Sequence, residues 1–329
     1  MKKKHIHISI ALFFISVSIS YCQRLSPYQP GAYYPGVEST RDMAAVDPGF
    51  YFINYSYWLN TQGYYDRNGN QFDGGIINNV DIASPKITAF IDVPLFFYCT
   101  PFKLFGAYYL VSATPVYLSS SQSAFISVGD SALNLSSSMR GFGDFSFMPF
   151  GLSWSDGERY DVSFMYTIYT PTGRFEIGAS DNLGQGFWTH QLQVPFYFYL
   201  NQKATGFMVI PTIELNGKIK EVDFRAGNRL SLEYGISQYI TEWLEVDLLN
   251  GHNWQLQDDK GKGAWWDDTR LDGLDSKNTF SVGVSAWPIS NTLCIRARYI
   301  QDYGAMQRFS NRFWSLSALF IPKTKSNQR

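Results

Sequence analysis

Few side chains in this sequence have the chemistry that enzymes use. Beyond residue 22 the 329-residue chain contains two histidines, His190 and His252. Gln-Leu follows the first and Asn-Trp follows the second, so neither belongs to a His-x-Ser pair or a His-Glu-x-x-His motif. Gly-x-Ser-x-Gly and Cys-x-x-Cys are also missing from the sequence. We therefore predict no catalytic residue, no cofactor and no enzymatic activity.

Acidic side chains gather in one stretch, residues 255–277. Carboxylates can bind Ca²⁺, but its ligands need an ordered spacing that this stretch does not have, so we expect a solvated extracellular loop and no metal site. Trp265 and Trp266 lie at its centre, where their rings could contact an outer-leaflet lipid or a hydrophobic solute. The carboxylates belong to Asp258, Asp259, Asp267, Asp268, Asp272 and Asp275.

The remaining cysteines argue against a disulfide-rich or metal-cluster protein, and the charge balance argues against a nucleic-acid-binding protein. Cys99 and Cys294 stand nearly 200 residues apart, which makes neither a disulfide framework nor a metal cluster. One bridge is an alternative, but we expect two unpaired cysteines. The formal net charge of −1 argues against nucleic acid as a partner.

The first 22 residues have the layout of an export signal. Three lysines follow the initiating methionine, an apolar run covers residues 8–19, and small residues come next. The run is shorter than the roughly 20 residues that a bilayer-spanning helix needs. We predict a signal peptide over residues 1–22. Lipidation of Cys22 is the alternative, and the bulky Tyr21 before it argues against that.

The elements that position these residues are predicted to be strands. Hydrophobic residues make up 45% of the chain and aromatic residues 17%, and aromatic enrichment favours strands. No later segment has 18 uninterrupted apolar residues, so we expect no transmembrane helix. Tyrosine and tryptophan also form the girdles of membrane barrels at the two lipid–water boundaries.

Apolar and polar side chains alternate along most of the chain after residue 48. In the stretch 159–170, for example, Tyr160 and Val162 point to one side while Asp161 and Ser163 point to the other. A strand with one apolar face and one mixed face suits a wall between lipid and an aqueous lumen. Twelve segments show this pattern, and an even number is what a closed bacterial outer-membrane barrel requires. They are 49–60, 85–98, 104–118, 143–155, 159–171, 187–200, 205–215, 228–240, 243–254, 278–287, 292–303 and 311–321.

The connections between these segments alternate in length. Short ones at 155–159, 240–243 and 288–291 are predicted to be periplasmic turns. Long ones, rich in Gly, Asp, Asn and Ser, are predicted to be extracellular loops. The long connections are 61–84, 119–142, 172–186 and 255–277.

Charged residues within the predicted strands indicate which face is the lumen. An arginine costs about 2–4 kcal/mol at the lipid midplane, so the charged face should point inward. A secreted β-sandwich also alternates, but its outward face would carry evenly spread charges. The inward charges could bias which solutes pass, or could instead hold the barrel interior together. These pore-lining candidates are Glu233, Glu245, Asp247, Arg296 and Arg298.

The chain therefore divides into four predicted parts. Residues 1–22 are the signal peptide, and the proline-rich residues 23–48 form an extended segment that is periplasmic, inside the barrel mouth, or a disordered linker. Residues 49–322 form the barrel and 323–329 a short tail. The last strand ends on the aromatic Phe320, which is typical of the signal that the barrel-insertion machinery binds.

Several motifs together resemble the family of outer-membrane proteins named after the meta-cleavage pathway of phenol degradation. The Gly-Phe-Gly-Asp segment is the most specific of them, and the resemblance covers about residues 40–322. The motifs are Asp47-Pro-Gly-Phe-Tyr51, Asp66-Arg-Asn-Gly-Asn70, the segment from Gly141 to Trp154, Tyr169-Thr-Pro-Thr-Gly173 with Asn182-Leu-Gly and Gly186-Phe-Trp188, and Leu230–Trp243.

The resemblance implies an outer-membrane β-barrel of the kind often described as a transporter for aromatic or other hydrophobic compounds. It implies no catalytic residues. The motif residues have structural roles of their own: Gly141 and Gly143 relax crowding where the chain enters a strand. Asp144 is expected to accept hydrogen bonds from turn amides or to line the pore, and Pro171 with Gly173 ends a strand.

Two functions remain from the sequence. The first is a channel or transporter in the outer membrane for small hydrophobic or aromatic compounds, with membrane lipid and the solute as partners. The second is a structural or adhesive barrel that transports nothing and binds a surface partner through its long loops.

Overall fold

The computed structural model describes residues 31–72, 75–77, 80–82, 86–128, 131–176, 179, 181–219, 222–262 and 274–322. The predicted signal peptide, Trp265, Trp266 and the predicted tail 323–329 lie outside these described residues. Within them, no helix is long and apolar enough to cross a membrane.

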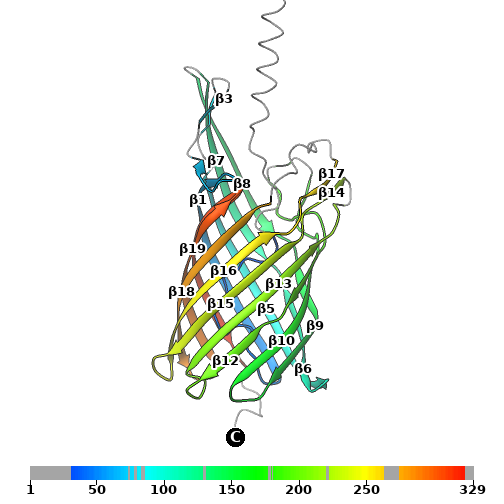
Figure 1. Ribbon diagram of the computed structural model, residues 1–329, viewed down its shortest axis with the longest axis vertical. Coiled ribbons are helices and arrows are strands. Elements are labelled where there is room, and N and C mark those ends of the chain that lie inside the picture. The colour runs from blue at the N-terminus through cyan, green and yellow to red at the C-terminus, as the bar shows by residue number, and fades with distance from the viewer. Residues whose placement is uncertain are drawn as a thin grey trace, which may run out of the picture.

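The strands form one closed antiparallel barrel (Figure 1). The last strand pairs with the first from Phe52 opposite Phe320 to Tyr65 opposite Arg308, which closes the barrel. Twelve strand positions surround the barrel, as the alternating segments predict. The wall consists of β1 (Gly49–Tyr65), β5 (Lys86–Leu104), β6 (Ala107–Thr114) continued by β7 (Tyr117–Val128), β8 (Ser131–Phe142) continued into β9 (Ser146–Ser155), β10 (Tyr160–Tyr169), β11 (Thr189–Gln193) continued by β12 (Phe196–Leu200), β13 (Thr205–Asn216), β15 (Arg229–Tyr239), β16 (Leu244–Gln255), β18 (Ser276–Ile289), β19 (Leu293–Met306) and β20 (Arg308–Phe320).

Two of these wall strands are interrupted at a proline. Pro115 separates β6 from β7, and Pro195 separates β11 from β12. Proline has no backbone N–H to donate to a neighbouring strand, so the ladder lapses there. Pro211, in contrast, stays in the ladder opposite Leu232.

The two ends of the barrel differ in the length of their connections. The turns 156–159, 201–204, 240–243 and 290–292 lie at the end where the last strand stops (Figure 1). Longer excursions leave the opposite end, as in outer-membrane barrels whose short turns are periplasmic and whose long loops are extracellular. Two of them pair with each other: β14 (Asp223–Arg225) lies between β13 and β15, and it pairs with β17 (Lys260–Lys262), which lies between β16 and β18.

The stretch 119–142, predicted as a loop, is instead a β-hairpin. β7 and β8 pair along their whole lengths, from Tyr117 opposite Phe142 to Val128 opposite Ser131. β4 (Val80–Ile82) adds to β7, and β3 (Gly75–Ile77) pairs with β4, so a small sheet rises from the long-loop end (Figure 1). The serines that suggested a loop sit in strands because paired neighbours satisfy their backbone groups. β1 likewise continues to Tyr65 and pairs with β2 (Gln71–Phe72).

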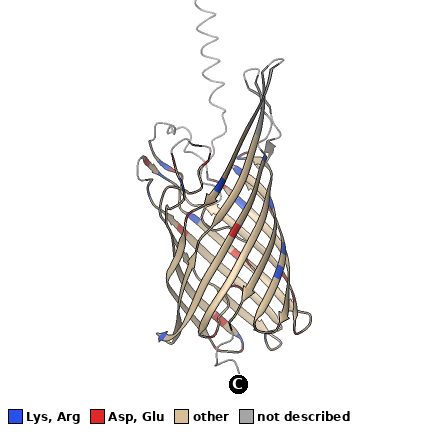
Figure 2. Ribbon diagram, turned by 180° about the vertical axis from the view of Figure 1, so that it is seen from behind, with Lys and Arg blue, Asp and Glu red and all other residues tan. Residues whose placement is uncertain are grey.

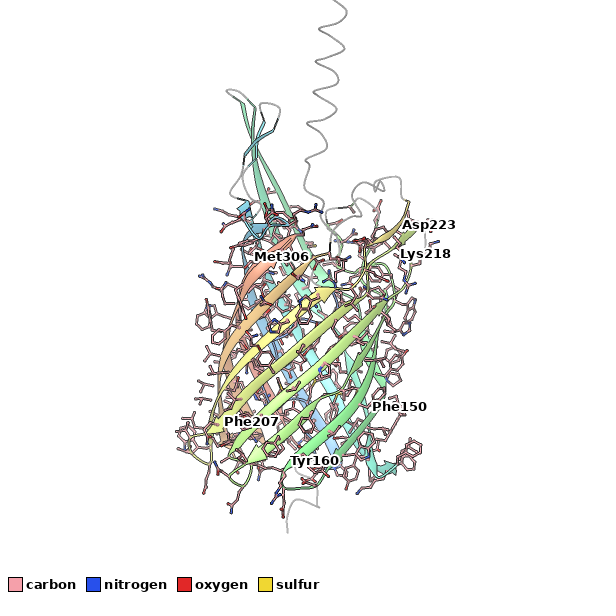
Figure 3. All side chains as sticks on the ribbon, in the orientation of Figure 1. Phe150, Tyr160, Phe207, Lys218, Asp223 and Met306 are labelled. Carbon is pink, nitrogen blue, oxygen red and sulfur yellow. The ribbon has the colours of Figure 1, made fainter. Side chains whose placement is uncertain are left out.

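Side chains alternate between the barrel interior and its outer face. In β13 every second residue is buried, while Phe207, Val209 and Ile213 are exposed on the outside. Figure 3 shows Phe150, Tyr160 and Phe207 on this outer surface, and Figure 2 shows how few charged residues interrupt the wall. Cys99 and Cys294 are both buried and both free, as expected.

A carboxylate in the middle of a wall strand faces outward. Asp92 in β5 alternates with Ile91 and Val93, which line the interior, so its carboxylate lies on the lipid side. Asn54 donates to its Oδ1 at 2.9 Å and Ser56 at 2.7 Å. These hydrogen bonds offset part of the cost of a carboxylate against lipid.

Candidate functional site in the barrel interior

The interior is occupied by the segment that precedes the first strand, residues 31–48. Its side chains contact inward-facing residues of β13, β15, β16 and β19. Tyr33 Oη donates to Glu233 Oε2 at 2.5 Å, and Arg41 Nε donates to Glu245 Oε1 at 2.5 Å. The segment therefore lies along one wall of the barrel.

Acidic groups of the wall hold the first part of this segment. The backbone amides of Ala32 and Tyr33 both donate to Glu214 Oε1, at 2.6 and 2.9 Å. Tyr34 Oη donates to Asp302, whose Oδ2 also accepts from Lys277 Nζ at 2.9 Å. The Lys277 ammonium lies over the Tyr34 ring, 3.1 Å from its centroid.

Charge pairs hold the second part of the segment. Arg41 packs over Tyr239, 4.8 Å from the ring centroid, and donates to Ser237 Oγ at 2.9 Å. The next residue, Asp42, accepts from Arg296 and, at 2.9 Å, from Tyr55 Oη. Arg41 and Asp42 of the segment thus each meet a side chain of opposite charge on the wall.

A further ion pair connects two wall strands beneath the segment. Arg298 Nη2 in β19 lies 2.5 Å from Asp247 Oδ1 in β16, and β18 runs between them. The β18 residue opposite both is Gly283, and a Cβ there would lie 2.7 Å from Arg298 Nη2 and 2.8 Å from Asp247 Oδ2. The glycine leaves the space through which the pair forms.

A second buried cluster lies near the long-loop end. Arg229 and Arg308 both bind Asp275, at 2.5 and 2.9 Å, and both donate to Asn253 Oδ1. The carboxylate accepts from two guanidinium groups, which compensates for its removal from water.

All five pore-lining candidates lie on the inner face of the barrel. They are buried, and salt bridges or hydrogen bonds hold each of them. None lines the open cavity described below, so pore lining stays a prediction for them. The five are Glu233, Glu245, Asp247, Arg296 and Arg298.

Sequence reasoning missed several residues of this interior network. Glu214 and Asp302 fall on the polar face of predicted strands, so the same alternation could have identified them. Lys277 and Arg308 lie just outside the predicted strand bounds. Arg41 and Asp42 lack a periodic signal because their segment is not a strand.

The opposite side of the lumen is apolar and open. The inward residues of β5 form a continuous apolar wall facing a cavity of about 510 Å³. The segment forms the other side of the cavity, where Val37 and Met43 contribute apolar surface and Glu38 a carboxyl group. The β5 wall consists of Ile87, Ala89, Ile91, Val93, Leu95 and Phe97.

A few polar groups converge on this cavity. Tyr55 and Tyr57 from β1 line it, and so do Gln191 and Gln193 from β11. Tyr169 Oη donates to Gln191 Oε1 at 3.1 Å. An apolar space with a few fixed polar groups is typical of sites for small organic molecules.

The glycine and aspartate motif residues meet at one place in the wall. Asp144 Oδ1 accepts from the Gly173 amide at 2.9 Å, and Oδ2 accepts from the Gln185 amide at 2.7 Å. Gly141 has a positive φ of 147°, and a Cβ there would lie 2.8 Å from Leu183 Cδ1.

Gly143 and Gly173 are also closely packed, and a Cβ on Gly143 would lie 3.1 Å from the Leu183 carbonyl oxygen. A Cβ on Gly173 would lie 2.9 Å from the carbonyl carbon of Gly143 and 2.8 Å from Gly184. Pro171 follows the last residue of β10 by two positions. The motif residues thus anchor the connection 170–188 to the wall.

Comparison with known proteins gives a consistent picture of the fold. A family model described as "Putative MetA-pathway of phenol degradation" matches residues 60–316. No match was found among curated proteins. The chain is similar to the crystal structure of the COG4313 outer membrane channel from Pseudomonas putida F1, with a TM-score of 0.63 and 13% identity over 88% of this chain and 100% of that one.

Two further solved structures are less similar. The translocator domain of the autotransporter NalP from Neisseria meningitidis has a TM-score of 0.44 and 10% identity, over 85% of this chain and 90% of that one. A FadL homologue from Pseudomonas aeruginosa has a TM-score of 0.39 and 11% identity, over 91% and 100%. The similarity to the COG4313 channel therefore confirms the closed twelve-strand barrel of outer-membrane type.

Proposed function

Because the chain belongs to the family named after the MetA pathway of phenol degradation, we propose that it is an outer-membrane channel that passes small hydrophobic or aromatic compounds. The observation that carries this proposal is the cavity of about 510 Å³ between the interior segment and the apolar wall of β5. The transfer of an apolar solute from lipid or water into such a space costs little free energy, because the solute makes no hydrogen bonds that it would have to give up.

The polar half of the interior favours the same assignment. The charges there are paired with one another or with the segment, so a polar solute would have to break ion pairs to pass on that side. On the side that remains open, the inward residues of β5 that line the cavity are all uncharged. Hydrophobic solutes are therefore favoured over sugars of similar size.

Permeation measurements test the proposal. Purified protein would be inserted into vesicles that carry lipopolysaccharide in the outer leaflet, and the uptake of a phenolic compound compared with that of a sugar of similar mass. Ile91→Trp fills the cavity and should slow phenolic uptake toward the protein-free rate. Leu316→Trp adds the same ring on the lipid-facing side of β20 and should leave uptake unchanged.

Three outcomes would each contradict one part of the proposal. Equal impermeability to both solutes favours the structural or adhesive barrel. Faster passage of the sugar than of the phenolic compound excludes the solute class. Equal rates for wild type and Ile91→Trp exclude the cavity as the route.

A further inference from the structure

A group of polar side chains on four neighbouring strands faces the membrane and not the lumen. In β16 the buried, inward residues include Glu245 and Asp247, so Asn250 and His252 lie on the outer face. β15, β18 and β19 each present one such residue at the same level. We call the five the outer polar patch: Tyr234, Asn250, His252, Asn278 and Tyr303.

Hydrogen bonds connect the whole patch. Asn250 Nδ2 donates to Tyr234 Oη at 2.9 Å, and Tyr303 Oη donates to Asn250 Oδ1 at 2.7 Å. The two ring nitrogens of His252 lie 2.6 Å from Asn278 Oδ1 and 3.2 Å from Tyr234 Oη. Amide, phenol and imidazole groups from four strands are thereby held in one hydrogen-bonded network.

Aromatic faces border these polar groups. The ring of Trp254 stacks on His252 with centroids 5.3 Å apart and an interplanar angle of 10°. Tyr234 is 42% exposed and Tyr303 is 45% exposed, so both rings are open to a molecule alongside the barrel. Such rings offer an apolar face and a polar edge together.

The patch lies where the apolar belt of the barrel ends. Toward the short-turn end the same strands expose Leu248, Val282 and Ile295. Tyr303 stands three residues before Met306, the last residue of β19, which Figure 3 shows toward the long-loop end. Because long loops of outer-membrane barrels are extracellular, the patch is at the headgroup level of the outer leaflet.

We propose that the outer polar patch binds the sugar headgroup of an outer-leaflet glycolipid. Neutral amide and phenol groups hydrogen-bond sugar hydroxyls, and the C–H faces of a sugar ring pack on aromatic rings. A phosphate would instead require arginine or lysine, and no patch residue is either. A second copy of the chain would need about 800 Å² of surface on each partner, far more than five side chains at one level present.

Lipid retention measured by native mass spectrometry tests this binding. The folded protein would be mixed in detergent with lipid A, with dephosphorylated lipid A, or with a phospholipid. Asn250→Leu/His252→Leu removes the centre of the patch and should reduce lipid A retention about thirtyfold, since it removes two hydrogen-bonding side chains worth about 1 kcal/mol each. His190→Leu is the matched control, because His190 also faces outward on β11, where it contacts Tyr166.

Tyr234→Phe/Tyr303→Phe keeps the rings and removes only the two hydroxyls. The loss of two hydroxyls should also lower retention about thirtyfold, and this variant decides the question if the leucine variant fails to fold, which a heat-modifiability gel would show. Unchanged retention in this phenylalanine variant overturns the proposal, because aromatic stacking alone would then suffice. The proposal is also overturned if dephosphorylated lipid A no longer binds, because phosphate would then be the group recognised. It is overturned as well if the wild-type protein forms a dimer that the leucine variant does not form.

Discussion

Replacing Arg41 by methionine should release the interior segment from the wall. Arg41 Nε lies 2.5 Å from Glu245 Oε1 and 2.9 Å from Ser237 Oγ, and Nη2 donates to the Lys203 carbonyl at 2.9 Å. The guanidinium also lies 4.8 Å from the centroid of the Tyr239 ring. Methionine retains much of the apolar contact and loses all of these polar interactions.

The magnitude follows from the burial of the pair. The Arg41 side chain is 14% exposed and that of Glu245 is 3% exposed. Removing one partner of a buried ion pair costs about 3–5 kcal/mol, because the other charge stays buried without compensation. A loss of that size changes the equilibrium between docked and released segment by about two to three and a half powers of ten.

Single-channel conductance in planar bilayers reports whether the segment has moved. Arg41→Met should raise the open conductance or add transitions to a larger state, since the released segment no longer narrows the lumen. Arg41→Met/Glu245→Leu removes both charges and should return the conductance toward the wild-type value. Arg174→Met breaks an exposed pair with Asp181, whose side chains are 54% and 47% exposed, and should change nothing.

Two results would refute this reasoning. If Arg41→Met conducts like wild type, the ion pair does not hold the segment in place. If the double variant conducts like the single one, the unpaired Glu245 is not the cause of release.

Two further predictions concern single positions. Gly304 has φ of +56°, and a Cβ there would lie 2.7 Å from Asn278 Nδ2, so Gly304→Ala should lower the temperature at which the folded band disappears on a heat-modifiability gel. Gly106 also has a positive φ, +80°, but open space around it, so an equal loss of stability in Gly106→Ala and Gly304→Ala would contradict the clash. Amides of the turn at Asp156, that of Tyr160 foremost, lower the pKa of this exposed carboxyl. The stabilisation that the ionised Asp156 carboxylate gives the folded state is therefore complete above the ordinary aspartate pKa of about 3.9. It is lost as the pH falls through the lower folded-state pKa. NMR titration in micelles should show that lowered pKa, and Asp156→Asn, which keeps an acceptor, should make the turn insensitive to acid. An Asp156 pKa at or above 3.9 would contradict the amide contacts.

The barrel was predictable because its signal is local. Successive strand residues face opposite sides, so the alternation in β13 or β16 is visible in any short window of sequence. Turn residues and strand number then determine a closed meander. The prediction was wrong at 119–142, where serine-rich sequence is typical of loops but pairing between β7 and β8 supplies the backbone hydrogen bonds.

Which face of β5 points into the lumen was not predictable from alternation. Both faces of this strand are largely apolar, so alternation does not separate lumen from lipid. The rule that charges face inward fails at Asp92, because Asn54 and Ser56 of the neighbouring strand bind its carboxylate on the outside.

By itself, then, the sequence determined the strands, their number and the inward direction of most charges, since each depends on residues close together in the chain. Only the tertiary structure decided which groups pair with those charged side chains. Glu214 binds amides 181 and 182 positions away, and the partner of Arg296 is 254 positions away. Barrel closure brings such residues together, and with them it divides the interior into a filled polar half and an open apolar cavity.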